Sequence, residues 1–291
     1  MTGPCLIADV VDFLQTVAPT DLAEDWDNVG LLIGREQASV ERIMTCLTLT
    51  PDVAAEAIEQ RAGLIVAHHP VLFRPVQRLT TDTPEGTMLL DLIGAGVAVY
   101  SPHTGYDSSR DGINQQLAEL FELQNITVLR PVARERAGDT EPDGCDAAAA
   151  DEVSTHVGES TRPAGAGRCG TLPRAMTLGE LMAQVKDRLS VGHLQFVGDE
   201  QRSVRRMAIA CGAAAEFLPD ALQQNCQVFL TGEARFHACL EARSRGLALI
   251  LPGHYATERP AMERLAEILA TQFPDLSVWA SRAETDPLRW A

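Results

Sequence analysis

The sequence predicts an α/β protein built from two similar halves. Short apolar runs alternate with segments whose apolar residues recur every three or four positions, a pattern typical of strands alternating with helices. The order helix, strand, strand, helix, strand, helix, strand, helix occurs twice. Segments 96–107 (GVAVYSPHTGYD) and 246–258 (GLALILPGHYATE) each contain a glycine-led apolar strand, a Pro, a His and a carboxylate four residues after the His. We therefore expect an internal duplication, although two α/β halves can also share an element order by chance.

The first half, residues 1–131, is expected to form one α/β repeat. An amphipathic helix over residues 6–17 places its apolar side chains on one face. Thr50 and Pro51 mark the start of a second helix, because Pro is favoured in the first turn. Apolar runs rich in β-branched residues predict the strands. The remaining helices are expected at 51–62, 84–96 and 111–123, and the strands at 30–33, 40–49, 63–70 and 96–107, the last with a polar tip.

Residues 132–168 interrupt this alternation. The segment is rich in Gly, Ala, Pro, Asp and Glu and nearly free of large apolar residues, so it cannot bury enough surface to order itself. We predict a flexible linker in which His156 has no role. The second repeat, residues 169–291, should have helices at 176–189, 214–225, 234–246 and 258–272 and strands at 194–198, 204–211, 226–233 and 246–258, the last with a polar tip.

Composition narrows the function. Lys and Arg total 24 against 40 Asp and Glu, and a formal net charge of −16 disfavours nucleic acid and anionic membrane partners. No segment approaches the roughly 20 apolar residues of a membrane span, and Asp9 and Asp12 interrupt the apolar run near the amino terminus. The seven cysteines form no CxxC pair, which argues against a disulfide framework or a thiolate zinc site. We expect a cytoplasmic protein.

The segment GLIVAHHP, residues 63–70, carries the first chemical signal. It predicts a buried strand that delivers His68 and His69 to its carboxyl end, where open α/β sheets usually bind ligands. A metal site would use both rings. The alternative for an isolated pair is that one histidine caps a turn and the other is solvated.

Two further pairs strengthen the case for metal. His103 and Asp107 are four residues apart, as are His254 and Glu258, and residues i and i+4 share one face of a helical turn. Imidazole and carboxylate together suit Zn, Fe, Mn, Ni or Co. Glu258 could instead be an acidic residue favoured by a helix amino terminus. The six candidates exceed one tetrahedral shell, so a centre of two ions accommodates them better.

Six sequence blocks resemble the Nif-three-like dinuclear metal-centre family, whose bacterial members are commonly labelled GTP cyclohydrolase I type 2 homologues. The blocks are WDNVGLLIG (26–34), VAHHPVLFRP (66–75), HTGYDSSRDGINQQLA (103–118), LQFVGD (194–199), FLTGE (229–233) and GHYATE (253–258). The resemblance implies two intertwined α/β domains with mixed sheets, and a homo-hexameric ring with metal sites facing its cavity.

The resemblance also assigns roles to individual residues. It implies that Asp107 and Glu258 bridge two divalent ions, and that His103 lies at the edge of the site as an acid or base. The residues implied as metal ligands are His68, His69, Asp107, His254 and Glu258.

Two functions follow from these expectations. The first is a metal-dependent hydrolase of the GTP cyclohydrolase I type 2 homologue kind, acting on a nucleotide or other small anionic substrate through metal-bound hydroxide, with Arg74 or Arg259 near an anionic group. For both arginines a surface salt bridge is the alternative. The second is a non-enzymatic ring that stores or delivers metal or binds a partner. A dinucleotide-binding domain is disfavoured, because no strand leads into GxGxxG.

Overall fold

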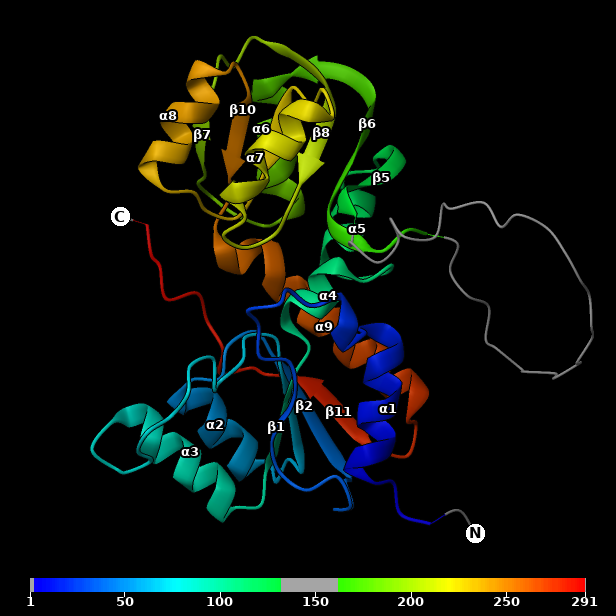
Figure 1. Ribbon diagram of the computed structural model, residues 1–291, viewed down its shortest axis with the longest axis vertical. Coiled ribbons are helices and arrows are strands. Elements are labelled where there is room, and N and C mark those ends of the chain that lie inside the picture. The colour runs from blue at the N-terminus through cyan, green and yellow to red at the C-terminus, as the bar shows by residue number, and fades with distance from the viewer. Residues whose placement is uncertain (1–2, 132–161, 291) are drawn as a thin grey trace, which may run out of the picture.

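Two mixed sheets form the framework of the protein (Figure 1), whose computed structural model describes residues 3–131 and 162–290. The first sheet has the strand order β1-β4-β3-β2-β11. In it β4, β3, β2 and β11 are parallel, and β1 pairs antiparallel with β4. Its strands are β1 (Gly30–Ile33), β2 (Arg42–Cys46), β3 (Leu64–Ala67), β4 (Ala98–Ser101) and β11 (Ser277–Ala280).

The second sheet has the order β5-β6-β8-β9-β10-β7. Here β8, β9 and β10 are parallel, whereas β7, β6 and β5 pair antiparallel with their neighbours. Its strands are β5 (Gln124–Pro131), β6 (Gly165–Thr177), β7 (Gln195–Val197), β8 (Ser203–Ile209), β9 (Val228–Leu230) and β10 (Ala248–Leu251).

The two sheets contain the same four-strand unit. The order β1-β4-β3-β2 in the first sheet corresponds to β7-β10-β9-β8 in the second, and the outer strand of each unit is antiparallel to its neighbour. The units are intertwined, because β11 from the end of the chain joins the first sheet and β5 from the first half joins the second. The predicted α/β class, with two intertwined units and mixed sheets, is confirmed.

Apolar cores lie on both faces of each sheet, which explains why the parallel strands are continuous apolar runs. Side chains alternate along β2, so that Ile43 enters the core between the sheets while Met44 packs under α2 and α3. The central core also takes in α1, α5, α6 and α9, and α7 and α8 cover the far face of the second sheet. The helices are α1 (Ile7–Val17), α2 (Pro51–Glu59), α3 (Pro84–Gly94), α4 (His103–Ser108), α5 (Ile113–Leu120), α6 (Leu178–Arg188), α7 (Leu218–Gln223), α8 (Phe236–Ser244) and α9 (His254–Gln272).

Several helix starts follow the sequence signals. The Thr50 hydroxyl accepts a hydrogen bond from the Val53 amide, and Pro51 occupies the first turn of α2. Thr177 and Glu180 form a reciprocal capping box at the start of α6. Helix α9 begins at His254, four residues earlier than expected, and runs from the second sheet towards the first (Figure 1).

The structure corrects the end of the predicted linker. Strand β6 begins at Gly165, so residues 165–168 are ordered in a sheet rather than in a flexible connection. Small residues here give no apolar signal, but the side chain of Arg168 is buried and its guanidinium donates to Gln115 Oε1 and to the carbonyl of Ser109. Residues 132–161 of the expected linker, with His156, lie outside the described residues.

Among the described residues, no helix has both the length and the apolar character needed to cross a membrane.

Candidate metal centre

Strand β3 places His68 and His69 at its carboxyl end. All four residues of β3 are buried, and its backbone pairing with β2 continues beyond the end of both strands. His68 N donates to the carbonyl of Cys46 and His69 N to that of Leu47, both at 2.9 Å. His68 is fully buried, whereas His69 is partly exposed. The adjacent histidines therefore lie at the carboxyl end of a central strand, where backbone hydrogen bonds fix their positions.

Two helix starts supply the other candidates. Helix α4 begins at His103 directly after β4, and α9 begins at His254 directly after β10. Asp107 and Glu258 follow one turn later on the same helical faces. The backbone of His103 has φ of +26°, a conformation that non-glycine residues rarely adopt and that is common at functional sites.

The structure brings these side chains into one cluster. Glu258 Oε2 lies 2.8 Å from His254 Nε2 and 3.1 Å from His69 Nε2, and these two nitrogens are 3.3 Å apart. On the other side, His68 Nε2 lies 3.6 Å from Asp107 Oδ1 and 4.0 Å from Glu258 Oε2. In both sets the donor atoms lie within 4.8 Å of one another. Glu258 is common to the two sets, and its Oε2 is the atom that approaches His68, His69 and His254.

His68 tests whether a metal fits. Both ring nitrogens of His68 are buried without a hydrogen-bond partner, and an unpartnered buried polar group is costly unless something binds it. Burial lowers the pKa of His68 well below its ordinary value, outweighing the opposite effect of Glu258. The ring is therefore neutral, which is the form that ligates metals. The residues present fit a divalent ion.

The carboxylates are also arranged for a cation. Burial raises the pKa of Asp107, and the nearby negative charge of Glu258 raises it further. Burial alone would raise the pKa of Glu258, but hydrogen bonds from His254 and His69 hold it well below its ordinary value. For His254, burial lowers the pKa, but Glu258 and Glu233 raise it to about 9. The charge of Glu258 is thus compensated by the proton that it keeps on His254, a role that a metal ion would take over.

The rings of His69 and His254 are each oriented by a contact at Nδ1. Thr48 Oγ1 lies 2.8 Å from His69 Nδ1, and Glu233 Oε1 lies 3.2 Å from His254 Nδ1. Both contacts leave Nε2 facing the cluster, as outer partners of metal-binding histidines do. These residues were not predicted as part of the site. Glu233 lies in the FLTGE block, but the sequence carries no signal for Thr48.

His103 is held by a residue that sequence reasoning also missed. Its Nδ1 is 2.7 Å from Asp27 Oδ1, and Thr104 donates its amide and hydroxyl to Asp27 Oδ2. Burial alone would raise the pKa of Asp27, but hydrogen bonds from His103 and Thr104 lower it to about 2. Burial alone would lower the pKa of His103, yet the hydrogen bond with Asp27 raises it. A ring nitrogen of His103 lies within 4.8 Å of ligand atoms of His68 and His69, so the ring also borders the cluster.

Two arginines expected near an anionic group, and two histidines outside the candidate set, have other surroundings. Arg259 is buried, with its Nε 2.8 Å from Glu284 Oε2, so it does not offer an open anion site. Arg74 lies in an exposed loop. His193 packs against Trp290 and His237 against Phe236, and neither belongs to a metal-competent group in the described residues.

A pocket of about 180 Å³ opens beside the cluster. Asp107, His254, Glu258 and His103 line one side, and small residues of the second half line another. Gly212 follows β8 with φ of +64°, and a Cβ there would lie 2.2 Å from Glu258 Oε1. Only glycine allows the backbone and the carboxylate to approach this closely.

Comparisons with known proteins agree on one family. The model of the family described as Duf34/NIF3 (NGG1p interacting factor 3) matches residues 5–287. A GTP cyclohydrolase 1 type 2 homolog of Clostridium acetobutylicum is 31% identical over 256 residues, covering 88% of this chain and 86% of the relative. A protein of the same name from Clostridium perfringens is 28% identical over 285 residues, covering 97% and 98%.

Solved structures show the same fold. A hypothetical protein of Staphylococcus aureus superposes with a TM-score of 0.84 at 29% identity, covering 99% of this chain and 100% of the other. A Bacillus cereus protein related to NIF3 gives a TM-score of 0.84 at 23% identity, with 100% of both chains covered. At that identity the second likeness concerns the fold alone.

Proposed function

Since this chain belongs to the Duf34/NIF3 family, we propose that it is a dinuclear metal-dependent hydrolase. One observation carries the proposal. Two sets of imidazole and carboxylate donors share Glu258 around the buried, unpartnered ring of His68. Nitrogen and oxygen donors in this mixture suit Zn, Fe, Mn, Ni or Co. The residues that would hold the two ions are His68, His69, Asp107, His254 and Glu258.

Two divalent ions, when bound, supply Lewis acidity and lower the pKa of water towards neutrality. The protein's own groups then handle the proton. Asp27 accepts the Nδ1 proton of His103, which leaves His103 Nε2 as the atom that takes a proton beside the cluster. Asp27 also fixes the ring, because Thr104 anchors its second oxygen. His103 is thus proposed as the acid or base of the reaction.

The substrate class comes from the relatives. The names of the Clostridium proteins refer to GTP cyclohydrolase, and a nucleotide or other small anionic molecule is our proposal for this chain. The pocket beside the cluster is lined by His103, Asp107, His254 and Glu258, so a molecule that enters it would reach the groups that hold the ions.

Metal counting combined with a turnover screen tests the proposal. Protein purified without added metal should carry two ions per chain by elemental mass spectrometry, and His68→Ala should lose them together with any hydrolysis of GTP or a panel of phosphoesters and metabolites. His103→Ala should keep the ions and lose turnover. His237→Ala, a histidine on α8 outside the donor groups, should match the unmodified protein.

The competing function is a metal-storing, metal-delivering or partner-binding homo-hexameric ring. A protein that holds two ions but leaves every candidate substrate intact would favour that role. Full turnover by a metal-free His68→Ala variant would contradict the hydrolase proposal.

A further inference from the structure

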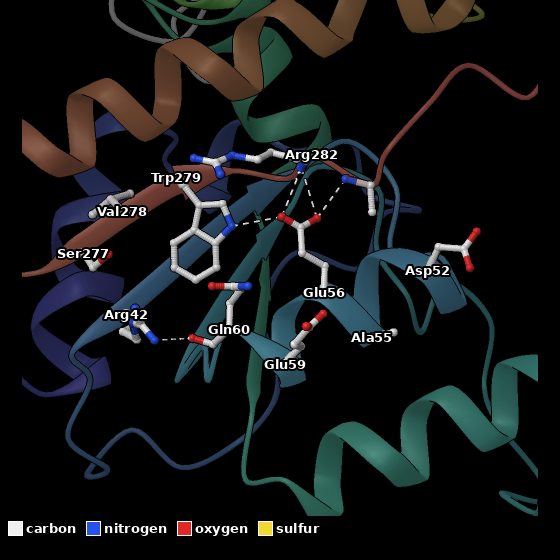
Figure 2. Close-up of a pocket in the computed structure, with 11 residues that line it drawn as sticks. Arg42, Asp52, Ala55, Glu56, Glu59, Gln60, Ser277, Val278, Trp279 and Arg282 are labelled. Carbon is white, nitrogen blue, oxygen red and sulfur yellow. Dashed lines mark hydrogen bonds between the residues drawn. The ribbon is translucent and has the colours of Figure 1, made fainter.

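The segment that follows β11 passes directly beside the candidate metal centre. Ser281 N donates to the carbonyl of Thr45, which extends the pairing of β11 with β2. The Glu56 carboxylate of α2 accepts hydrogen bonds from Trp279 Nε1 at 3.2 Å, from Ser281 Oγ at 2.6 Å and from Ala283 N at 2.9 Å. Figure 2 shows Glu56 between α2 and this segment, on the wall of a pocket of about 640 Å³. These hydrogen bonds fix the position of the segment as far as residue 283.

This path carries Glu284 into the interior. Its side chain is only 4% exposed. One carboxylate oxygen accepts the amide of Leu47 at 2.9 Å, and the other accepts the amide of Thr48 at 2.6 Å. The guanidinium of Arg259 approaches with Nε at 2.8 Å. Both carboxylate oxygens of Glu284 thus accept backbone amides from the segment after β2, and one of them also forms an ion pair with Arg259 of α9.

Both groups that Glu284 contacts lead to metal-ligand candidates. The carbonyl of Leu47 accepts the amide of His69 at 2.9 Å, and the hydroxyl of Thr48 lies 2.8 Å from His69 Nδ1. The same two residues are therefore held by Glu284 through their amides and hold His69 through their oxygens. On the other side, Arg259 immediately follows Glu258 on α9.

We propose that Glu284 is a positioning residue for the metal centre: it holds the Leu47–Thr48 backbone that orients His69 and, through Arg259, the start of the helix that carries Glu258. The inference rests on the proposed metal centre and goes beyond it, because the side-chain hydrogen bonds and ion pair of Glu284 within the described residues go to Leu47, Thr48 and Arg259 rather than to the ligand candidates. Charge-assisted hydrogen bonds in a dry interior are short and directional, so a buried carboxylate can fix a loop more tightly than a neutral group. The rival explanation is that Glu284 only neutralises Arg259 and supports folding.

Metal affinity separates these explanations. The probe is Co²⁺, whose visible absorption reports the geometry of its ligands, titrated into metal-free full-length protein in competition with a chromogenic chelator. Loss of an outer partner of a metal ligand typically weakens binding roughly 10- to 100-fold. We expect Glu284→Gln to weaken Co²⁺ binding by that factor and to change the absorption bands. Thr48→Val should weaken Co²⁺ binding to a lesser extent. Thr48→Ser, which keeps the hydroxyl, should bind Co²⁺ as tightly as the unmodified protein.

The matched control is Glu56→Gln. It loosens the same C-terminal segment at a carboxylate whose hydrogen bonds, within the described residues, come from Trp279, Ser281, Arg282 and Ala283. It should leave Co²⁺ affinity unchanged. Equal losses in Glu56→Gln and Glu284→Gln would overturn the proposal, because docking of the whole segment would then explain both.

The remaining outcomes are also decisive. If the unmodified protein binds Co²⁺ and a folded Glu284→Gln variant binds it equally well, the inference fails and the metal centre stands. If the unmodified protein binds no Co²⁺, both fail. If Glu284→Gln does not fold, the Thr48 pair decides, and equal affinity of Thr48→Val and Thr48→Ser would overturn the proposed link to His69.

Discussion

His68 shows at the scale of one residue what sets this site apart from an ordinary protein interior. A fully buried imidazole normally finds a hydrogen-bond partner, because leaving a polar group unpaired costs about 1–3 kcal/mol. Both nitrogens of His68 lack one, while Asp107 and Glu258 lie within 4 Å of its Nε2. Such an arrangement destabilises the metal-free protein and favours a cation, as expected where stability is sacrificed for function.

Asp27 provides a prediction about His103. Asparagine at position 27 keeps the size of the side chain but removes the negative charge, so Asp27→Asn should lower the pKa of the His103 imidazole in metal-free protein. The check is the pH titration of the His103 ring proton by NMR. Asp25→Asn, a change at an exposed neighbouring carboxylate, is the control, and a His103 pKa that does not move in Asp27→Asn would show that the hydrogen bond has no influence on the ring.

Gly212 provides a second prediction at this scale. Gly212→Ala puts a methyl group 2.2 Å from Glu258 Oε1, so the carboxylate must move and metal affinity should fall by at least tenfold. Gly246→Ala is the matched control, because Gly246 also has a positive φ but its Cβ would meet nothing within 4 Å. Both changes should cost roughly 1–2 kcal/mol of unfolding free energy for the left-handed backbone. Equal metal affinity of the two variants, measured by Co²⁺ titration, would contradict the steric argument.

At the scale of elements, strand ends and helix starts position the site. β3 ends in the histidine pair, and β4 and β10 each end one residue or two before a helix whose first turn carries a histidine and a carboxylate. This repeated strand-to-helix unit explains why the ligands are closely spaced in sequence within each unit. Strand β11 adds a different element, since it brings the C-terminal segment to the edge of the first sheet beside β2.

The contact between α2 and the C-terminal segment should depend on pH. Burial alone would raise the pKa of Glu56, but hydrogen bonds from Ser281, Ala283, Arg282 and Trp279 lower it. A lowered pKa contributes stability above the ordinary value of about 4.3 and loses it as pH falls through the folded-state value. The stability advantage of the unmodified protein over Glu56→Gln should therefore be constant near neutral pH and shrink below about pH 4.

Urea unfolding at a series of pH values measures this difference. Glu59→Gln, on the same helix and on the wall of the same pocket, serves as the comparison and should show no such shrinkage. A gap between Glu56→Gln and the unmodified protein that stays the same down to pH 3 would argue that the Glu56 carboxylate is not the acceptor that matters.

At the scale of the whole molecule, the site joins the two sheets. His68, His69 and Asp107 come from the unit around the first sheet, and His254 and Glu258 follow β10 of the second. The two parts are also tied elsewhere: Thr45 Oγ1 donates to the carbonyl of Met262, and Cys211 N donates to Asn114 Oδ1. Metal binding should consequently stabilise the entire fold rather than one half.

This coupling can be measured by thermal unfolding. Free Co²⁺ at 100 times its dissociation constant should add about 2.7 kcal/mol per site to the free energy of unfolding, and the transition should move to higher temperature as a single step. His254→Ala should lose most of the shift, although it removes a ligand from the second unit only. A shift confined to one of two separate transitions would show that the halves do not unfold together.

Local patterns identify much of the fold and all six candidate residues of the cluster. Continuous apolar runs predict the strands β2, β3, β4, β8 and β10. Helix starts such as Thr50-Pro51 are predicted by the residues that cap them. β5, β6 and β11 were not predicted, because none of them is a long apolar run and each is stabilised by pairing with a strand distant in sequence. Asp27, Thr48 and Glu284 were not predicted as part of the site, because their contacts join residues that are distant in the sequence.

The sequence by itself determined the kinds of ligand and their local geometry, since a strand end, a histidine pair and an i, i+4 spacing depend only on neighbouring residues. The tertiary structure alone decided that these ligands form one cluster. His69 and Glu258 are 189 positions apart, and Leu47 and Glu284 are 237 apart. Contacts at such separations arise from the intertwining of the two sheets, and short-range side-chain periodicity carries no information about them.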